Sequence, residues 1–427
     1  MTSPSTRGTP GGPLPLSGVR VVEFSHMVMG PSCGLILADL GADVVKVEPV
    51  GRGDGTRRLP GSGAGFFPAY NRNKRSLALD VTKPRGLALA RRLIDRADVL
   101  IENFRPGAFD ALGLGWEAVR ATNPRLVYCA LKGFLAGPYE GRTALDEVVQ
   151  MMGGLAYMTG PPGRPLRAGA PVNDVMGGMF AAIAILAALL ERARTGEGQL
   201  VRSGLFENVA WLVSPHMAQL AVTGKAPEPM PARTSAWAIY DVFEAADGRQ
   251  IFVAVVSDAQ WPRFCRAFHL PELLADARLA TNAERVAARE RFLPRVRAAL
   301  RRLGCDEIAR TCEGAGLPFA PIQRPDELFR DPHLACPGAT VEHTLEDGAK
   351  LSLPALPVEL GGCRLGRRLD LPRVGEHTAE IAAELGYGGA EVEALANEGV
   401  VGVDRARSAT SPSPQPATPP TRTPRDP

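Results

Sequence analysis

A single carboxylate, Asp174, stands directly ahead of sixteen residues without a charge, at positions 175–190. An aspartate before a helix is a preferred N-cap, because its oxygens accept backbone N–H groups and its charge suits the positive end of the helix dipole. Such hydrogen bonds lower the pKa of a carboxyl group, so a capping aspartate stays ionised and can also attack an activated acyl group. Periodicity alone favours the cap, and capping is compatible with a nucleophile.

Two glycines, Gly177 and Gly178, fall in the first turns of the same predicted helix. Each costs about 1 kcal/mol relative to alanine inside a helix, so the pair needs a reason. We expect a group to approach the helix backbone closely beside Asp174.

Cationic residues gather in two short segments, each next to the end of a predicted strand. Open α/β sheets bind ligands beyond the carboxyl ends of their strands, and phosphate recognition combines forked guanidinium donors with ammonium point charges. A polyphosphate partner and a solvated surface are both compatible with these segments. The two clusters are Arg52, Arg57 and Arg58 in "GRGDGTRR", and Arg72, Lys74 and Arg75 in "NRNKRS".

Three further polar residues, Asn103, Arg105 and Lys132, follow two later predicted strands. They should begin loops at the same edge of the sheet, where function concentrates. A nicotinamide dehydrogenase is a weak alternative for such a sheet: the first βα turn, "EFSHMVMGPSCG", offers Gly30 and Gly34 but no GxGxxG, although Glu48 imitates a ribose-binding acid.

The elements that must position these residues alternate between short β-rich runs and helical stretches. "VRVVEF", "DVVKVE", "RSLALDV", "DVLIENF" and "RLVYCAL" are separated by helical segments, including one at 84–95, which predicts a parallel sheet flanked by helices. "YDVFEAADGRQIFVAVV" predicts a hairpin with its turn at Asp247 and Gly248. We therefore expect a large α/β domain at 16–224, a small α+β domain at 225–330 and a return to the large domain at 331–400, between disordered tails at 1–15 and 401–427.

Composition excludes several classes of partner. The formal charge of +3 is too weak to suggest nucleic acid, and the apolar run at 175–190 is shorter than the roughly 20 residues that span a bilayer. The first residues have no apolar run of secretory length, so a cytoplasmic protein is expected. None of the seven cysteines forms a CxxC pair, which favours buried thiols over a metal site.

Five segments together resemble the class III coenzyme A transferases, a family that includes formyl-CoA transferase and carnitine CoA-transferase. They are "LSGVRVVEFSHMVMGPSCGLILADLGADVVKVE", "NRNKRSLALDV", "ADVLIENFRPG", "DVMGGMFAAIAILAALLERARTGEGQ" and "VGEHT", in order, within residues 16–390. The resemblance implies a Rossmann-like large domain with a parallel sheet, a smaller α+β domain, and two chains threaded through one another as an interlocked homodimer.

The resemblance also implies a role for Asp174, which occupies the position of the family's catalytic aspartate. That residue attacks an acyl-CoA thioester to give an aspartyl anhydride and CoA thiolate, and the thiolate then forms an aspartyl-CoA thioester. An incoming carboxylic acid completes the exchange. This chemistry requires no metal and no tightly bound cofactor, and coenzyme A is a cosubstrate. Glycines beside Asp174 would let backbone N–H groups approach the developing oxyanion.

By the same resemblance, the CoA contacts of formyl-CoA transferase fall on one set of positions in this chain. Arg72, Lys74 and Arg105 would then meet the phosphates of CoA, and three further residues are candidates for the substrate side. The CoA set is Val28, Met29, Asn71, Arg72, Asn73, Lys74, Asn103, Phe104, Arg105 and Lys132; the substrate set is His26, Phe134 and Arg233.

This sequence departs from formyl-CoA transferase in three places. Val28 replaces a glutamine, Ala111 replaces an arginine, and "KAPEPMPARTSAW" stands where a glycine-rich run covers the active site. Formate and oxalate are therefore disfavoured as substrates. Arg233 in the replaced segment is a candidate clamp for a dicarboxylic acceptor, and succinyl-CoA is the first donor to consider.

Two alternatives stay open within the same superfamily. The α-methylacyl-CoA racemases carry a histidine before an aspartate where this chain has Leu145 and Asp146, so a two-base racemase would lack one base. A non-catalytic CoA-binding protein would retain the fold without acyl chemistry at Asp174. The pattern favours CoA transfer from an acyl-CoA to a small carboxylic acid.

Overall fold

A computed structural model describes residues 13–233 and 235–404 of the chain, which divides into two compact units. The first unit comprises residues up to 157, 166–218 and 336 onward, and the second comprises 158–165 and 219–335. The boundaries predicted at 225 and 330 lie inside the second unit, and separate folding of two domains stays a prediction. Most of the two predicted tails lies outside the described residues.

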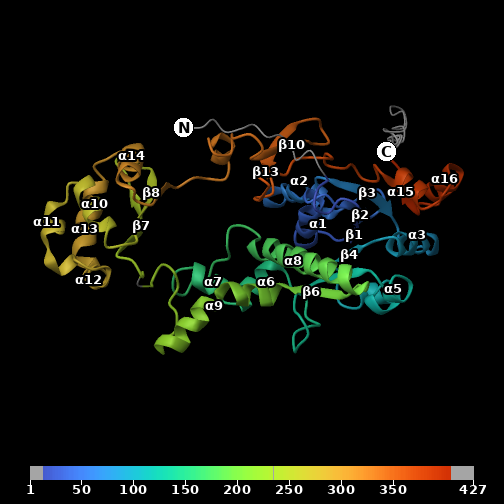
Figure 1. The fold of residues 1–427 in the computed structure, drawn as a ribbon, viewed down its shortest axis with the longest axis horizontal. Helices are drawn as coiled ribbons and strands as arrows, with labels where there is room; N and C mark the ends of the chain where they lie inside the picture. The colour runs from blue at the N-terminus through green and yellow to red at the C-terminus, as the bar shows by residue number, and fades with distance from the viewer. Residues whose placement is uncertain (1–12, 234, 405–427) are drawn as a thin grey trace, which may run out of the picture. The chain divides into compact units, whose positions relative to one another are not determined.

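The first unit is built on a seven-stranded sheet in the order β14-β3-β2-β1-β4-β5-β6 (Figure 1). All pairings are parallel except the one between β14 and β3. The predicted start of the C-terminal tail, at residue 401, is too early, because residues 401 and 402 pair with β3. The strands are β1 (Arg20–Phe24), β2 (Asp43–Glu48), β3 (Lys74–Leu79), β4 (Val99–Glu102), β5 (Val127–Lys132), β6 (Leu200–Gly204) and β14 (Val401–Gly402).

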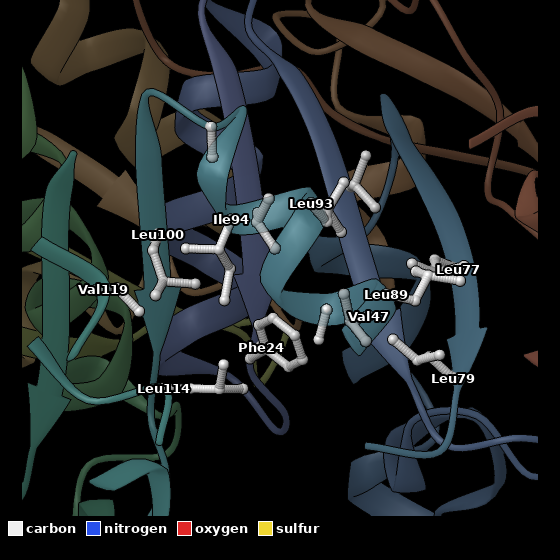
Figure 2. Close-up of a cluster of buried hydrophobic side chains, with 14 of the residues drawn as sticks. Phe24, Val47, Leu77, Leu79, Leu89, Leu93, Ile94, Leu100, Leu114 and Val119 are labelled. Atoms are coloured by element: carbon white, nitrogen blue, oxygen red, sulfur yellow. The ribbon is translucent and has the colours of Figure 1, made fainter. Parts of the chain in front are cut away.

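Both faces of this sheet are covered, which explains why its strands are nearly continuous apolar runs. Alternate residues of a strand point to opposite faces. Val22 of β1 belongs to one core cluster and Val21 to another, so each face has its own core. Figure 2 shows the first of these cores, in which Phe24 and Val47 lie with Leu89 and other side chains of the helix at 84–95. The prediction of an α/β fold with a parallel sheet is confirmed.

Helices of the first unit connect and cover the strands (Figure 1). The helix predicted at 84–95 is confirmed as α3, with Pro84 in its first turn. The helices are α1 (Met29–Asp39), α2 (Phe66–Tyr70), α3 (Pro84–Asp95), α4 (Ala108–Ala111), α5 (Trp116–Thr122), α6 (Asp146–Met152), α7 (Leu155–Thr159), α8 (Val172–Thr195), α9 (Leu205–Thr223), α15 (Thr378–Glu384) and α16 (Gly389–Asn397), α7 and α9 running into the second unit.

Helix α8 is longer than its apolar run, and among the described residues it alone is long and apolar enough to cross a membrane. Its buried residues, such as Ile185, pack instead in the core on the α1 side of the sheet. A Cβ on Gly178 would lie 2.0 Å from Ser32 Oγ and 2.7 Å from the Met29 carbonyl oxygen, both in α1. The close approach predicted at the glycines is therefore confirmed, and the approaching group is a neighbouring helix; a role of their backbone N–H groups toward a reacting oxyanion stays a prediction.

The second unit contains the predicted hairpin, with β7 (Ile239–Glu244) paired to β8 (Gln250–Val255) and β9 (Phe319–Pro321) added at the edge of β8. Gly248 has a positive φ of 77° in the turn, which glycine tolerates. The stretch at 282–303 contains two helices: a capping box at Thr281 starts the first, and the second begins at Arg289. The helices are α10 (Gln260–Ala267), α11 (Pro271–Ala275), α12 (Asn282–Ala287), α13 (Arg289–Leu300) and α14 (Cys305–Ala315).

After the second unit, the chain returns to the first through two small hairpins. They pair β10 (Thr340–Thr344) with β11 (Lys350–Pro354), and β12 (Glu359–Leu360) with β13 (Cys363–Arg364). The loop that follows contacts the third strand: the backbone N–H groups of Arg368 and Leu369 donate to Asn73 Oδ1 at 2.6 and 2.8 Å. The C-terminal segment therefore helps to fix the start of β3.

Candidate active site

The strand order reverses direction between β1 and β4, and open α/β sheets bind ligands at such a point. The two loops that leave these strands are tied to each other. Asn103 Oδ1 accepts from the backbone N–H of His26 at 3.1 Å, and Asn103 Nδ2 donates to the His26 carbonyl oxygen at 2.8 Å. Met27 has a positive φ of 65° in this tied loop. These hydrogen bonds hold the loops after β1 and β4 together at the point where the strand order reverses.

A pocket of about 370 Å³ opens at this edge. Its lining combines the loops after β1, β4 and β5 with the first turns of α6 and α8. The volume is in the range of small-molecule sites. The predicted site residues that line it are His26, Val28, Met29, Asn103, Lys132 and Asp174.

Asp174 does not cap helix α8, because it is the third residue inside the helix. The N-cap is Pro171, which has no side chain that can accept a hydrogen bond. Asp146, from α6, takes the acceptor role: its Oδ2 accepts from the backbone N–H groups of Asn173 and Asp174, each at 2.9 Å. The prediction that Asp174 caps the helix is therefore wrong, and its side chain lines the pocket instead.

The pKa of Asp174 is raised to about 7, which is opposite to the lowering expected for a cap. Burial is the largest cause, and the negative charges of Asp146 and Glu147 add to it. Tyr70, at the end of α2, also senses this carboxylate: burial raises its pKa, and the Asp174 charge contributes. Near neutral pH, Asp174 therefore exchanges between its acid and its carboxylate.

Lys132 ends β5 and is tied to the β4 loop. Its Nζ lies 2.5 Å from Glu102 Oε1 and donates to the Phe104 carbonyl oxygen at 3.0 Å. A second pocket, of about 150 Å³, shares Lys132 with the first and is also lined by Arg105 and Phe134. Phe134 is buried in an aromatic cluster and lines this second pocket, and its role in substrate binding stays a prediction.

The basic clusters are largely neutralised by buried carboxylates. Arg72 Nη2 lies 2.7 Å from Asp39 Oδ2, and Lys74 Nζ lies 2.7 Å from Glu23 Oε2. Their side chains are 3% and 0% exposed, so neither presents a free charge to a phosphate. Of the other predicted cations, Arg57 and Arg75 are likewise engaged, with Glu48 and Asp43.

The same network rules out the suggested role of Glu48 as a ribose-binding acid. Its Oε1 accepts from Arg57 Nη2 at 2.7 Å and from Ser76 Oγ at 2.6 Å, and its Oε2 accepts from the Asp54 backbone N–H at 2.7 Å. A buried carboxylate that already has these partners is not available to a ribose. The dehydrogenase alternative loses its one supporting residue.

Asn71 and Asn73 are buried and support this network. Asn71 Nδ2 donates to the Phe67 carbonyl oxygen, and its Oδ1 accepts from Lys74 Nζ at 3.1 Å. Asn73 adopts a φ of 61°, and its Nδ2 donates to Asp39 Oδ1 at 2.8 Å. Their observed contacts are structural, and their assignment to CoA stays a prediction.

Arg105 and Phe104 are exposed on the β4 loop, within reach of solvent. Arg233 is exposed in the second unit, and its role as a carboxylate clamp stays a prediction. Sequence reasoning missed Arg167, an arginine that lines the Asp174 pocket and pairs with Glu147. It also missed the structural role of Asp146, because a hydrogen bond between residues 28 positions apart leaves no local pattern.

Within residues 13–233 and 235–404, no group of three or more His, Cys, Asp and Glu side chains has the arrangement of a metal site. Five cysteines are buried, and the thiols of Cys33 and Cys129 contact each other across α1 and β5.

Comparisons with known proteins find a family model and similar sequences. A family model described as CoA-transferase family III matches residues 16–378. The chain is 34% identical over 383 residues to succinate–glutarate CoA-transferase of Agrobacterium fabrum, covering 87% of this chain and 96% of that protein. It is 32% identical over 380 residues to succinyl-CoA–D-citramalate CoA-transferase of Chloroflexus aurantiacus, covering 87% and 94%.

The fold has similar relatives among solved structures. A CaiB/BaiF family protein from Brucella suis matches with a TM-score of 0.77 and 34% identity, over 88% of this chain and 100% of that one. Family model, full-length relatives and fold agree, so this chain belongs to CoA-transferase family III and is an acyl-CoA:carboxylate CoA-transferase.

Proposed function

We propose that the chain transfers CoA through covalent intermediates on Asp174. The observation that carries this proposal is the position of Asp174 in the switch-point pocket, with Val28, Met29, Asn103 and Lys132 around the same space. A thioester is already activated, so a positioned carboxylate is sufficient as nucleophile.

Each step exchanges one acyl bond for another. A carboxylate oxygen of Asp174 attacks the donor thioester carbonyl, the C–S bond breaks, and CoA thiolate leaves an aspartyl anhydride. The thiolate attacks the aspartyl carbonyl of that anhydride, which releases the donor acid and leaves an aspartyl-CoA thioester. The acceptor carboxylate attacks this thioester and expels the thiolate again, and thiolate attack on the acceptor acyl carbonyl restores the Asp174 carboxylate.

We propose that CoA enters along the β1, β4 and β5 loops, past Val28, Asn103, Arg105 and Lys132. Arg105 is the most accessible cation of the predicted set, because Arg72 and Lys74 are buried against carboxylates. The contribution of Arg72, Lys74, Asn71 and Asn73 to CoA binding is then indirect, through the shape of the β3 loop.

We propose dicarboxylic substrates, with succinyl-CoA as donor. Two relatives carry names with succinate or succinyl-CoA and a dicarboxylic partner. Arg167 is the candidate in the pocket for binding the free carboxylate of such a substrate, because it lines the same space as Asp174. It is paired with an exposed glutamate, Glu147, which a substrate carboxylate can displace. Arg233 remains a second candidate clamp.

We also propose that the chain acts as an interlocked homodimer. Helices α8 and α9 carry several exposed apolar side chains, and Trp211 is 65% exposed. Exposed apolar side chains on neighbouring stretches of chain are compatible with a protein interface. The others are Met179, Ile183, Leu190, Leu212 and Met217. Sedimentation analysis of the full chain should give a dimer, and a monomer at working concentration would refute this part.

The covalent proposal is tested by intact-mass measurement of the protein with succinyl-CoA, with and without hydroxylamine. Hydroxylamine should convert the acylated Asp174 to a hydroxamate that peptide mapping places at this residue, and Asp174→Ala should give none. Acyl-CoA binding without any adduct would favour a non-catalytic binding protein. Exchange of the α-proton with solvent would instead favour a racemase, for which Leu145 lines the pocket in place of the histidine.

A further inference from the structure

The first turn of α8 is held by a residue from another helix. Backbone N–H groups at the second and third positions of a helix lack intrahelical partners and are usually satisfied by the N-cap side chain. Pro171 has no such side chain, and Asp146 Oδ2 accepts both groups at 2.9 Å. Asp146 is 5% exposed and is the first residue of α6.

A second connection fixes the segment that leads into α8. Gln150, one turn further along α6, donates from Nε2 to Asp146 Oδ1, and its Oε1 accepts from the Ala168 backbone N–H at 2.8 Å. Gln150 is fully buried. Two side chains of α6 therefore hold both the loop at 168–171 and the first turn of α8, where Asp174 lies.

We propose that Asp146 is a positioning residue for CoA transfer: by taking the two free N–H groups of α8, it sets the position of the Asp174 carboxylate and keeps those donors away from it. This inference rests on the proposed nucleophilic role of Asp174. An aspartate near a helix N-terminus would otherwise bond these N–H groups itself, which would make its oxygens less nucleophilic.

The charges around Asp174 come from several elements. Burial is the largest cause of the raised pKa of Asp174, and the negative charges of Asp146 and Glu147 on α6 add to it. The basic groups of the same pocket are Arg167, Lys132 and His26. Arg167 is paired with Glu147, and Lys132 with Glu102, so their charges are partly offset. Among these groups, Asp146 alone is bonded to the Asp174 backbone.

The test compares Asp146→Asn with Asp146→Ala in the full chain, using succinyl-CoA and glutarate and following kcat and KM across pH. Asp146→Asn keeps one acceptor oxygen but removes the charge, so the acid limb of the kcat/KM profile should move to lower pH by about one unit. Asp146→Ala removes the acceptor too, and displacement of Asp174 should lower kcat by roughly 100-fold with little change in the KM for acyl-CoA.

Two control variants separate the effects. Glu147→Gln removes a like charge that makes no bond to α8, so it should shift the acid limb, and because it also frees Arg167 its effect on the KM for glutarate is measured separately. Asp347→Asn makes the same chemical change as Asp146→Asn in an exposed turn between β10 and β11, and should leave kcat and the pH profile unchanged.

An unmoved acid limb in Asp146→Asn, together with wild-type kcat in Asp146→Ala, would overturn the inference. So would loss of folded protein in both variants by circular dichroism, because Asp146 would then be structural only. Failure of the proposed function is distinguishable: Asp174→Ala would retain transfer in that case, whereas it loses transfer if only the Asp146 inference fails.

Discussion

Glu23 and Asp174 are two carboxylates of the first unit with opposite surroundings. Glu23 has no exposed surface, and its two oxygens lie 3.2 Å from Lys46 Nζ and 2.7 Å from Lys74 Nζ. Burial by itself would raise its pKa, but the charges of Lys74 and Lys46 outweigh burial and leave the pKa below its ordinary value. Glu23 is therefore a fixed negative charge inside the fold.

Asp174 is less buried, yet its pKa moves the other way, to about 7. Its nearest charged neighbours on α6 are carboxylates, and they add to the effect of burial. The sign of the adjacent charges, more than depth, thus decides which carboxylate is structural and which can change its protonation during a reaction. Three substitutions and one pH series test this contrast.

The largest effect is expected from Asp174→Asn. An amide cannot form an acyl anhydride, so the rate of CoA transfer should fall by roughly four orders of magnitude or more, as for other nucleophile deletions. A discontinuous assay that separates CoA esters by chromatography measures the loss, with Asp347→Asn as the matched exposed control. A variant with more than a few per cent of wild-type activity would contradict a nucleophilic Asp174.

Lys74→Met removes one of the two cations that hold Glu23 ionised. Breaking a buried ion pair leaves an uncompensated charge, so the free energy of unfolding should fall by about 3–5 kcal/mol. Denaturant unfolding measures it, and Arg324→Met, which breaks an exposed pair with Asp326, should cost about 1 kcal/mol or less. Weaker CoA binding at unchanged stability would mean instead that Lys74 contacts a phosphate directly.

The pH dependence of stability should distinguish the two carboxylates. The folded-state pKa of Asp174 lies above its unfolded value, so its contribution is fully present below about pH 4 and is lost as pH rises through about 7. Asp174→Asn should therefore unfold less readily than wild type near pH 8, by a few kcal/mol at about 1.4 per pKa unit. The difference should vanish near pH 4, and a constant difference across this range would contradict the raised pKa.

Gly178→Ala should give the smallest effect, because it tests the packing of the helix that carries Asp174. The added Cβ meets Ser32 Oγ at 2.0 Å and backbone atoms of α1, and such overpacking costs about 1–3 kcal/mol. Gly314→Ala in α14 is the control: nothing lies within 4 Å of its Cβ, so it should stabilise by up to about 1 kcal/mol. Thermal unfolding of the two variants should shift in opposite directions.

Local patterns predicted much of the fold. The helix at 84–95, the apolar helix after Asp174 and the hairpin turn at Gly248 depend on neighbouring residues, so they could be read along the chain. The placement of loop residues at one sheet edge also held for Asn103 and Lys132, because carboxyl ends of parallel strands meet there. The resemblance of whole segments then identified the family.

What the sequence by itself determined was the set of elements and the residue types at the sheet edge, since short-range periodicity and turn residues encode both. Only the tertiary structure decided which charges remain free. It paired Arg72 with Asp39 and Lys74 with Glu23, and it gave the cap of α8 to Asp146. Partners in these contacts lie tens of residues apart, and desolvation and Coulomb interactions depend on distance in space, so the state of Asp174 emerges only when the chain is folded.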